Sequence, residues 1–466
     1  RAPTPLQRDL GARIASADPT ASMAEDGAGA SSGGLRVVGV GDVGGEVHDP
    51  VDAKARTAAE GILADVRAQG MGAVLRHATR LGDLEDAAAK HIYTRDDLKE
   101  AYDALDSAEQ QLLVRTAERV RFFAAAQRDA VTDIEVPIPG GVAGHRVAPV
   151  AAAGCYAPGG RYPLPSSVIM TAVTARAAGV PAVWVASPRP APATLAAAHV
   201  AEADGLLAVG GAQAIGALAY GVEGIPKVDV IVGPGNKWVT AAKSLVAGVC
   251  AIDMLAGPSE VLVIVDDSAD ADTVAADLLA QAEHDTEARP ILVSTSDTMI
   301  GEVNAKIAQR LSELPTAETA REAVAKGFAV KVADVGEAVR VSDQIAPEHL
   351  EVQTVDARAV GLNCTNYGAL FVGSLAAEVL GDYGAGPNHV LPTGGTARYC
   401  GGLSVNTFLR VRTFMELTDA AAAQETVRDA VALARVEGLE GHARAAECRL
   451  AAADAEDGNA AKRRRV

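Results

Sequence analysis

The sequence predicts an α/β protein with two Rossmann-like parallel-sheet modules and additional N- and C-terminal helical segments. Short apolar runs rich in Val, Ile and Leu alternate with helical patterns, as in parallel strands joined by helices. The alternation restarts near residues 250–258, which indicates a second module. Hydrophobic residues make up 49% of the chain and aromatic residues only 3%, which favours Ala-rich helices packed on aliphatic strands.

Two segments precede the first module. Residues 1–34 show little periodicity and are expected to form a loosely ordered extension. Residues 35–149 are expected to form an N-terminal helical segment, with helices at 50–69 and 96–129 and a β-like run at 130–150.

The first α/β module is expected over residues 150–257 and should carry the cofactor site. It begins with a β-like run and the Gly-rich turn at 154–160. The elements that follow are a helix at 165–179, a strand at 182–186, a helix at 191–203, a strand at 206–209, a helix at 213–220, a strand at 228–232 and a helix at 237–248.

The second module is expected over residues 258–415 and should carry the catalytic residues. Its elements are a strand at 261–265, a helix at 270–285, a strand at 290–294, helices within 298–326, a strand at 328–332 and a helix at 334–342. The last helices, within 418–455, stand apart from both sheets in a C-terminal segment over 416–466.

Charge and cysteine usage exclude several classes of protein. The formal net charge of -18 disfavours general binding to nucleic acid or anionic membranes, and no run of 18 apolar residues predicts a membrane span. Five scattered cysteines without CxxC spacing suit a reducing compartment and argue against a cysteine zinc site.

We expect a cytoplasmic protein, or a plastid stromal one if the N-terminus is a processed transit region. The basic tail at 462–465 is interpreted as a solvated end.

Two glycine-rich turns invite a nucleotide interpretation. Gly39–Gly44 matches GxGxxG, but no helical pattern follows it, so it is interpreted as a flexible loop. Gly233-Pro234-Gly235-Asn236 lies between an expected strand and an expected helix, where open sheets bind ligands. Spacing alone leaves an ordinary tight turn equally open there.

Four polar clusters point to a metal and to acid–base chemistry. Gln281 and His284 are three residues apart on one helix face, so their side chains can share a cation. Glu348 and His349 place a carboxylate beside an imidazole. Asp382 with His389, and Glu437 with His442, lie in glycine-containing segments. Each cluster alone fits capping or surface charge, but four together favour a site.

In their order along the chain, these motifs resemble the histidinol dehydrogenase family from about residue 50 to 450. The matching segments are Tyr156-Ala157-Pro158-Gly159-Gly160, Gly211-Ala212-Gln213-Ala214-Ile215, Gly233-Pro234-Gly235-Asn236, Ala256-Gly257-Pro258-Ser259-Glu260, Gln281-Ala282-Glu283-His284, Ala346-Pro347-Glu348-His349-Leu350, and Gly381-Asp382-Tyr383 through Asn388-His389-Val390-Leu391-Pro392-Thr393.

The resemblance implies a zinc enzyme that oxidises L-histidinol to L-histidine in two NAD-dependent steps, the last of histidine biosynthesis. It implies one zinc per subunit and a homodimer whose C-terminal segment completes the partner's site. The implied roles are zinc ligation by Gln281, His284, Asp382 and His442, acid–base catalysis by Glu348 and His349, and cofactor contact by Tyr156, Gln213 and Asn236. Substrate contacts are implied for Ser259, Gln281, His284, His349, Asp382, His389, Glu437 and His442.

Elementary chemistry agrees with these implied roles. An imidazole with a pKa near neutrality suits removal of a hydroxyl proton as hydride leaves, and a neighbouring carboxylate can activate the water that hydrates the aldehyde. A substrate with an amine and an imidazole offers good ligands for a borderline cation such as zinc.

Other functions stay open at this point. Arg161-Tyr162-Pro163-Leu164 and Leu255 depart from the pattern typical of the biosynthetic enzyme, so a related zinc- and NAD-dependent enzyme acting on another small primary alcohol, such as a dihydroxypropanesulfonate, is the alternative. The five-residue offset between Glu437 and His442 favours histidinol. A metal-dependent hydrolase would have no use for the expected cofactor residues, and a scaffold protein would need no adjacent Glu348 and His349.

Overall fold

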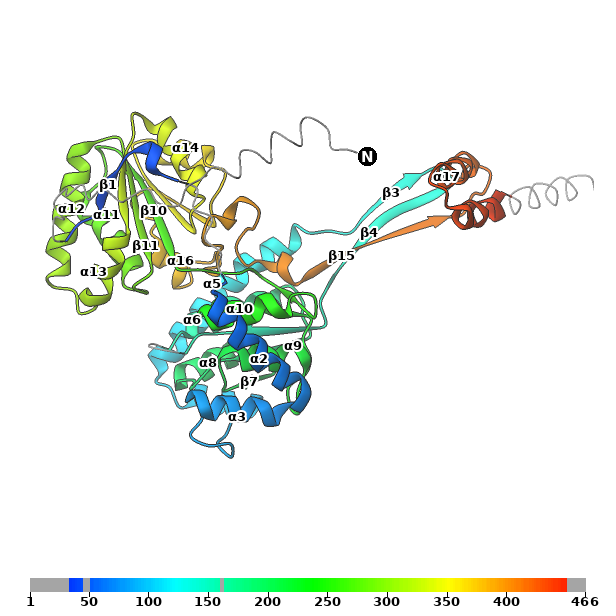
Figure 1. Ribbon diagram of the computed structural model, residues 1–466, viewed down its shortest axis with the longest axis horizontal. Helices are drawn as coiled ribbons and strands as arrows, with labels where there is room; N and C mark the ends of the chain where they lie inside the picture. Colours follow the sequence, from blue (N-terminus) through cyan, green and yellow to red (C-terminus); the bar gives the residue numbers. More distant parts are fainter. Residues whose placement is uncertain (1–32, 45–50, 160–162, 451–466) are drawn as a thin grey trace, which may run out of the picture.

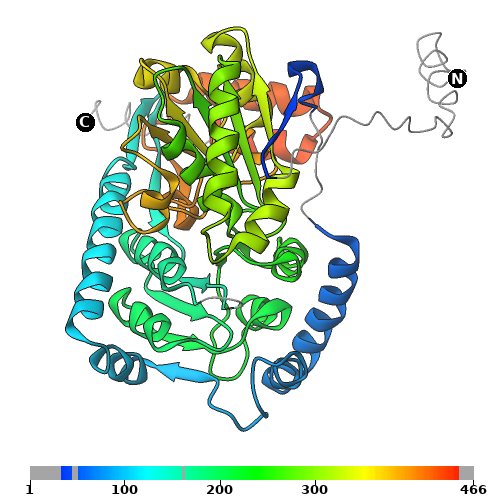
Figure 2. The same ribbon diagram turned by 90° about the vertical axis from the view of Figure 1, so that its left-hand side faces the viewer.

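The computed structural model describes residues 33–44, 51–159 and 163–450, which form two α/β modules and a protruding arm (Figure 1). The predicted fold class is confirmed, because two six-stranded, largely parallel sheets are each covered by helices. Figure 2 shows the two modules one above the other. Among the described residues, no helix is long and apolar enough to cross a membrane. The expected extension up to residue 32 and the basic tail lie outside the described residues.

The sheet of the first module has a single antiparallel strand, at its edge. In spatial order its strands are β2 (Ile92–Thr94), β7 (Gly205–Leu207), β6 (Ala182–Ala186), β5 (Ala152–Tyr156), β8 (Val230–Val232) and β9 (Ala251–Ile252). The strand order reverses direction between β5 and β8, which is where open α/β sheets bind ligands beyond their carboxyl ends. Every residue of β5 is buried, as expected when helices cover both faces.

Helices cover both faces of this first sheet. One face carries α2 (Ala53–Gln69), α3 (Met71–Leu81), α9 (Gly211–Tyr220) and α10 (Lys237–Val246). The other carries α4 (Arg95–Asp103), α5 (Ser107–Asp129), α8 (Pro192–Val200), and the continuous helix made of α6 (Pro165–Val168), the π-helical turn η2 (Ile169–Val173) and α7 (Thr174–Ala177).

The sheet of the second module is parallel throughout. Its spatial order is β1 (Arg36–Val38), β12 (Phe328–Lys331), β11 (Arg289–Ser294), β10 (Glu260–Val265), β13 (His349–Gln353) and β14 (Ala369–Val372). One face carries α11 (Ala271–Ala282), α12 (Asp297–Leu311) and α13 (Ala317–Lys326), and the other carries α14 (Val335–Ile345) and α15 (Ala357–Asn363). The short helix α16 (Glu378–Asp382) follows β14.

The arm extends from the junction of the modules (Figure 1). It consists of an antiparallel sheet of β3 (Ile134–Ile138), β4 (Gly141–Pro149) and β15 (Leu409–Leu417), followed by α17 (Gln424–Val436) and a helical stretch at 440–450. Nine consecutive residue pairs join β4 to β15, so the arm reaches roughly 30 Å at ~3.3 Å per residue.

Several expected segments are divided differently in the structure. Within the segment at 35–149, β3 and β4 lie in the expected β-like run at 130–150, whereas β1 and β2 were not expected and join the sheets of the second and first modules. The helix expected at 96–129 is two helices, since the Asp106 carboxylate caps the start of α5 by accepting from the Glu109 N–H. The helices expected within 298–326 are α12 and α13. Residues 409–415, expected in the second module, belong to the arm.

Candidate active site at the junction of the modules

Glu348 and His349 lie at the amino end of β13, where it meets the amino end of β10. The Glu348 Oε2 accepts a hydrogen bond from the Glu260 N–H (2.9 Å), and the His349 Nδ1 lies 3.0 Å from the Glu260 carbonyl oxygen. A carbonyl can only accept, so Nδ1 carries a proton and Nε2 is the atom left to exchange one. Nε2 is buried and has no hydrogen-bond partner within the described part of the chain.

Further carboxyl groups surround the His349 imidazole. The Glu378 Oε2 lies 3.7 Å from Nδ1, and the Asp382 Oδ1 lies 3.8 Å from Nε2. Both carboxyl groups come from α16, which returns from the end of β14 to the amino edge of the sheet. The Glu378 N–H donates to the Glu351 Oε1 (2.8 Å), which fixes the start of this helix.

Burial and mutual charge set the protonation of this cluster. Burial raises the pKa of Glu348 to about 8, although the imidazole of His349 opposes the shift. Burial lowers the pKa of His349, but the carboxylates of Glu348, Glu378 and Asp382 outweigh it and raise that pKa to about 10. The pKa of Glu378 lies well above its ordinary value because the group is buried. The surrounding carboxyl groups therefore favour a positive charge at this point.

Gln281, His284 and Asp382, predicted from the resemblance as metal ligands, lie beside this cluster. The His284 Nε2 is 3.6 Å from the Asp382 Oδ2. The Gln281 amide is fully buried, and the orientation that satisfies its neighbours donates Nε2 to the Glu378 Oε2 (2.9 Å). No three His, Cys, Asp or Glu side chains form a metal-binding group within residues 33–44, 51–159 and 163–450. A single chain thus supplies one imidazole, one carboxylate and one amide here, a mixed N/O set that suits zinc but lacks a fourth ligand.

His389 connects the cluster around Glu348 and His349 to the first module. Its Nδ1 lies 3.0 Å from the Asp382 carbonyl oxygen and its Nε2 lies 3.4 Å from the Ser167 Oγ in α6. The preceding Asn388 donates Nδ2 to the Met170 carbonyl oxygen (2.8 Å), in the π-helical turn η2. A π turn leaves helix carbonyls without their usual partners, so the Asn388 amide both satisfies the turn and fixes the loop that carries His389.

The predicted cofactor residues Tyr156 and Gln213 meet at the carboxyl edge of the first sheet. The Tyr156 hydroxyl accepts from the Gly211 N–H (3.2 Å), at the start of α9. Gly211 has φ +63°, which favours glycine. Gln213 is buried and donates Nε2 to the Asp83 Oδ2 (3.0 Å).

Asn236, the third predicted cofactor residue, caps a helix. Its Oδ1 accepts from the N–H groups of Trp238 and Val239, at the start of α10. Asp253 fixes the turn that precedes Asn236, because its Oδ2 accepts a hydrogen bond from the Gly233 N–H (2.7 Å). This glycine turn at the end of β8 is thus a fixed backbone cradle at the strand-order reversal.

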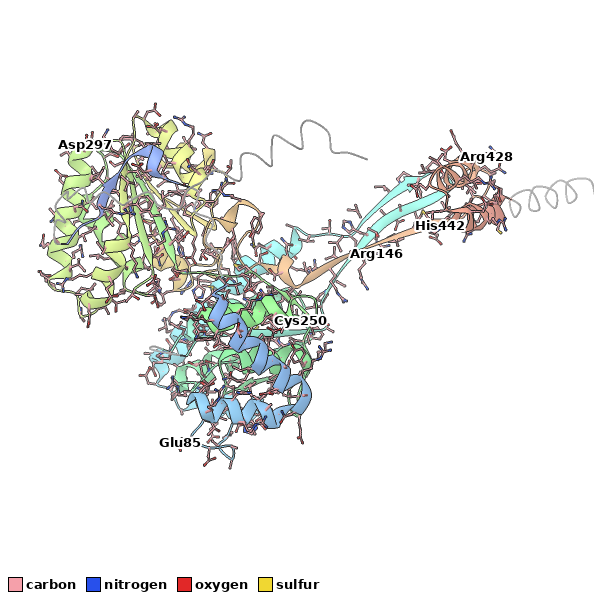
Figure 3. All side chains as sticks on the ribbon, in the orientation of Figure 1. Glu85, Arg146, Cys250, Asp297, Arg428 and His442 are labelled. Carbon is pink, nitrogen blue, oxygen red and sulfur yellow. The ribbon has the colours of Figure 1, made fainter. Side chains whose placement is uncertain are left out.

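Glu437 and His442 are not brought to the other site residues within one chain. Both lie at the far end of the arm, and Figure 3 labels His442 there, away from the modules. Ser259, by contrast, directly precedes β10, and its carbonyl oxygen accepts from the Arg289 N–H.

Sequence reasoning missed Glu378, Asp83 and the backbone role of Glu260. No local pattern marks these residues, because their importance comes from burial against distant segments. A carboxylate four residues before Asp382 in an apolar setting was the available signal for Glu378.

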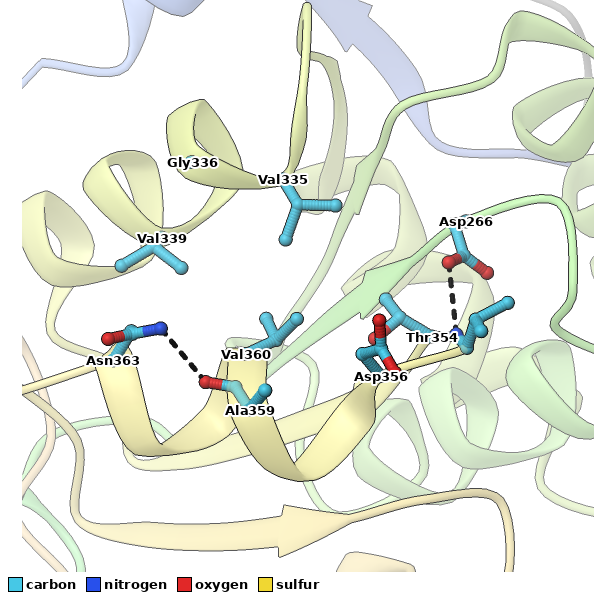
Figure 4. A pocket seen from close by; sticks show the side chains of 10 residues that line it. Asp266, Val335, Gly336, Val339, Thr354, Asp356, Ala359, Val360 and Asn363 are labelled. Atoms are coloured by element: carbon cyan, nitrogen blue, oxygen red, sulfur yellow. Dashed lines mark hydrogen bonds between the residues drawn. The ribbon is translucent and has the colours of Figure 1, made fainter.

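A separate hollow of about 410 Å³ lies at the carboxyl edge of the second sheet, between α14 and α15 (Figure 4). Asp266 and Thr354 contribute to its wall, but the Asp266 carboxylate is occupied by the N–H groups of Ser268 and Val355. His349 starts its strand at the opposite edge. This hollow is therefore distinct from the candidate active site.

Comparison with known proteins agrees with the geometry. The histidinol dehydrogenase family model matches residues 48–450. The chain is 44% identical to a histidinol dehydrogenase from Thermus thermophilus, over 84% of this chain and 93% of that protein. It is 41% identical to one from Methanococcus maripaludis, over 84% and 92%. The crystal structure of histidinol dehydrogenase from Elizabethkingia anophelis superposes with a TM-score of 0.84 at 28% identity, covering 90% of this chain and 99% of that one. The chain therefore belongs to the histidinol dehydrogenase family of oxidoreductases.

Proposed function

We propose that this chain oxidises L-histidinol to L-histidine through L-histidinal, with two NAD molecules and one zinc ion per subunit. The observation that carries the proposal is the buried Glu348–His349 pair, fixed by both backbone groups of Glu260 beside the donors Gln281, His284 and Asp382. The alcohol, one water and two NAD⁺ give the carboxylate, two NADH and three protons. The reaction would be the last step of histidine biosynthesis.

His349 is the base for the alcohol in its neutral form, which the positive charge of a bound zinc ion would favour by offsetting the carboxylates that raise the pKa of this imidazole. Its Nδ1 proton is held by the Glu260 carbonyl, so Nε2 is the atom that would take the hydroxyl proton; NAD, when bound, would supply the hydride acceptor. Nε2 is buried and without a partner in the described part of the chain, as a group reserved for substrate would be.

Glu348 is the base for the second half-reaction. The aldehyde must become a hydrate before a second hydride can leave, so a water has to lose a proton as it adds to the carbonyl carbon. Glu348 has a pKa raised by burial to about 8, which makes its carboxylate a stronger base than an exposed one. The Glu260 N–H holds its Oε2 in place.

Zinc would be held by Gln281, His284 and Asp382 with the partner's His442, and would orient the amine and imidazole of the substrate. The donor set supports this ligation, because one amide, one imidazole and one carboxylate lie together and favour a borderline divalent cation.

The arm supports a homodimer with shared sites. Its strands and helix expose large apolar side chains that its own chain does not cover, namely Ile134, Val136, Val411, Met415, Leu433 and Val436. Exposed apolar surface of this kind marks a protein interface. A second copy would cover the arm and receive Glu437 and His442 beside its own cluster.

The direct test is NADH formation from L-histidinol, measured by absorbance with and without a chelator and compared with other small primary alcohols, dihydroxypropanesulfonate included. We expect turnover with histidinol, its loss on chelation and its return with added zinc. Faster turnover with another alcohol would assign the chain to that substrate, and no NADH with any alcohol would contradict the proposal.

Shared sites are tested by mixing inactive His442→Ala and inactive His349→Asn chains. A hybrid dimer contains one intact site, so random exchange restores about a quarter of wild-type activity. Mixing His349→Asn with Asp382→Ala is the matched control, because both residues come from the same side of the site and no intact site can form. Equal results from the two mixtures would contradict sharing.

A further inference from the structure

Two polar side chains of β13, Glu351 and Gln353, are buried between the second sheet and α11. In the strand they pair with Val263 and Val265 of β10, whose side chains pack on α11. Side chains two residues apart on a strand point to the same face of a sheet, so both share the face of His349. Glu351 is fully buried and Gln353 is 4% exposed. Polar groups at such depth need partners within the protein.

Glu351 caps the helix that carries the candidate ligand Asp382. Its Oε1 accepts from the N–H of Glu378, the first residue of α16 (2.8 Å). The N-cap position of α16 is Ala377, whose side chain cannot accept a hydrogen bond. A helix of five residues gains little from its own hydrogen bonds, so its position depends on contacts of this kind with the rest of the fold.

The other oxygen of Glu351 connects this cap to α11. The Gln353 Nε2 donates both to the Glu351 Oε2 (3.2 Å) and to the Asp277 Oδ2 (2.8 Å). Burial raises the pKa of Glu351 to about 8 and the charge of Asp277 adds to the shift, so Glu351 keeps a proton at neutral pH and donates it to that carboxylate. Asp277 precedes Gln281 by one turn on α11.

The two helices that carry proposed zinc ligands are therefore joined at three successive levels. The first joins the start of α16 to Asp277, through β13. The second is the hydrogen bond from the Gln281 amide to the Glu378 carboxyl group (2.9 Å). The third is the approach of the His284 Nε2 to the Asp382 Oδ2 (3.6 Å). The first level contains no proposed ligand, so it can fix the distance between the helices without binding the metal.

We propose that Glu351, Asp277 and Gln353 are positioning residues for the zinc site. They hold α16 against α11, so that Asp382 is presented to the same cation as His284. The inference rests on the proposed function for the identity of the metal. Groups that support metal ligands from behind commonly change metal affinity by a factor on the order of 10 to 100, because zinc tolerates only a narrow range of ligand distances.

Glu351→Met removes the cap with little change in side-chain length. A thioether offers no strong acceptor to the Glu378 N–H and no proton to Asp277. Glu351→Gln is the conservative variant, because its amide oxygen accepts where Oε1 did and its amide nitrogen donates to Asp277. Ile307→Ala, in the core of the same module on α12, is the control for a general loss of stability.

Zinc affinity is measured on the full chain by competition with a chromogenic chelator. Cobalt(II) is the second probe, because its visible absorption depends on the number and arrangement of its ligands. We expect Glu351→Met to bind zinc more weakly by a factor on the order of 10 to 100 and to change the cobalt spectrum. Glu351→Gln should stay within about threefold of wild type and keep the spectrum, because it reproduces both hydrogen bonds. Ile307→Ala should keep both properties at a lower melting temperature.

A double variant separates positioning from folding. Glu351→Met leaves the Asp277 carboxylate buried without its proton donor, so the melting temperature should fall. Glu351→Met with Asp277→Asn removes that charge and should recover most of the melting temperature. Zinc affinity should stay low in the double variant, because the start of α16 is still without its cap.

Three results would overturn the inference. One is equal zinc affinity in Glu351→Met and Ile307→Ala. Another is zinc binding by Glu351→Gln as weak as by Glu351→Met, and the third is recovery of zinc affinity together with stability in the double variant. Failure of the proposed function would look different. A wild-type chain that binds zinc in a Glu351-dependent way but does not oxidise histidinol supports the positioning role and contradicts the histidinol assignment.

Discussion

Lys243→Met should destabilise the first module strongly, because Lys243 neutralises a buried carboxylate. The side chains of Lys243 and Asp253 are 3% and 0% exposed and form an ion pair. The Lys243 Nζ also donates to the Gly233 carbonyl oxygen (3.0 Å). Asp253 keeps only the N–H groups of Gly233 (2.7 Å) and Met254 (2.6 Å) when the ammonium is removed. The variant therefore leaves a buried charge without its counterion.

The expected loss is about 3–5 kcal/mol, the range for breaking a buried ion pair from one side. For a module of this size, each kcal/mol lowers the melting temperature by about 2–4 °C, so the shift should be on the order of 10 °C. The lost bond to Gly233 also loosens the turn at 233–236, so NAD affinity should fall with stability.

Tryptophan fluorescence during thermal unfolding is the suitable assay. The chain has two tryptophans, Trp184 in β6 and Trp238 in α10, and both belong to the first module. Lys227→Met, at an exposed lysine of the same module, is the control and should change stability by less than about 0.5 kcal/mol. Lys243→Met with Asp253→Asn should recover part of the loss, because the unpaired charge is gone. Equal melting temperatures for Lys243→Met and Lys227→Met would refute the reasoning.

Three further predictions concern the catalytic cluster and the carboxyl groups behind it. His349→Asn should lower kcat by a factor on the order of 10² to 10⁴, as expected for loss of a general base. His77→Asn, on α3, is the control. Near-normal turnover of His349→Asn would mean that another group takes the proton. Glu348→Gln should still form the aldehyde, which can be trapped and measured as a hydrazone, but should form little acid. Equal loss of both half-reactions would contradict the role of Glu348 as the base that activates water. Burial raises the pKa of Glu351 to about 8 from 4.5, and the Asp277 carboxylate adds to the shift. A carboxyl group with a raised pKa stabilises the fold fully below pH 4.5 and loses that contribution as the pH rises through about 8. Glu351→Gln keeps the uncharged shape, so its melting temperature relative to wild type should be higher at pH 9 than at pH 5. A pH-independent difference would contradict the raised pKa of Glu351.

The parallel strands were predictable because their signal is local. The runs at 182–186 and 261–265 are apolar without alternation, as buried parallel strands are, and the structure has β6 at the first and β10 at 260–265. The strand β1 was not predicted, because three residues can be assigned to a sheet only through their partner. That partner is β12, almost 300 residues away in the chain.

The same limit applies to the site. Glu348 and His349 are adjacent in sequence, so a local pattern sufficed to single them out, and the structure places them together at one strand end. Glu378 belongs to the cluster only because α16 returns along the sheet, and no periodicity over five residues predicts that path. Asn236 shows the reverse case, since the residue predicted to contact cofactor uses its amide oxygen to cap α10.

The candidate site residues of the two modules lie at opposite edges of their sheets. The first sheet places Tyr156 and the glycine turn after β8 at its carboxyl edge, the usual ligand site of an open α/β sheet. The second sheet places Glu260 and His349 at the first residues of β10 and β13, at its amino edge. Because Glu260 and His349 are parts of strands, the hydrogen bonds between the parallel strands hold their backbone in place. The His349 imidazole and the Glu348 carboxylate, which bond to the backbone of Glu260, are therefore held in fixed positions. The carboxyl edge of the second sheet has a hollow, in whose wall the Asp266 carboxylate accepts hydrogen bonds from the loop N–H groups of Ser268 and Val355. Joining the carboxyl edge of one sheet to the amino edge of the other would bring the proposed nucleotide site to the proposed acid–base pair, with neither module holding both.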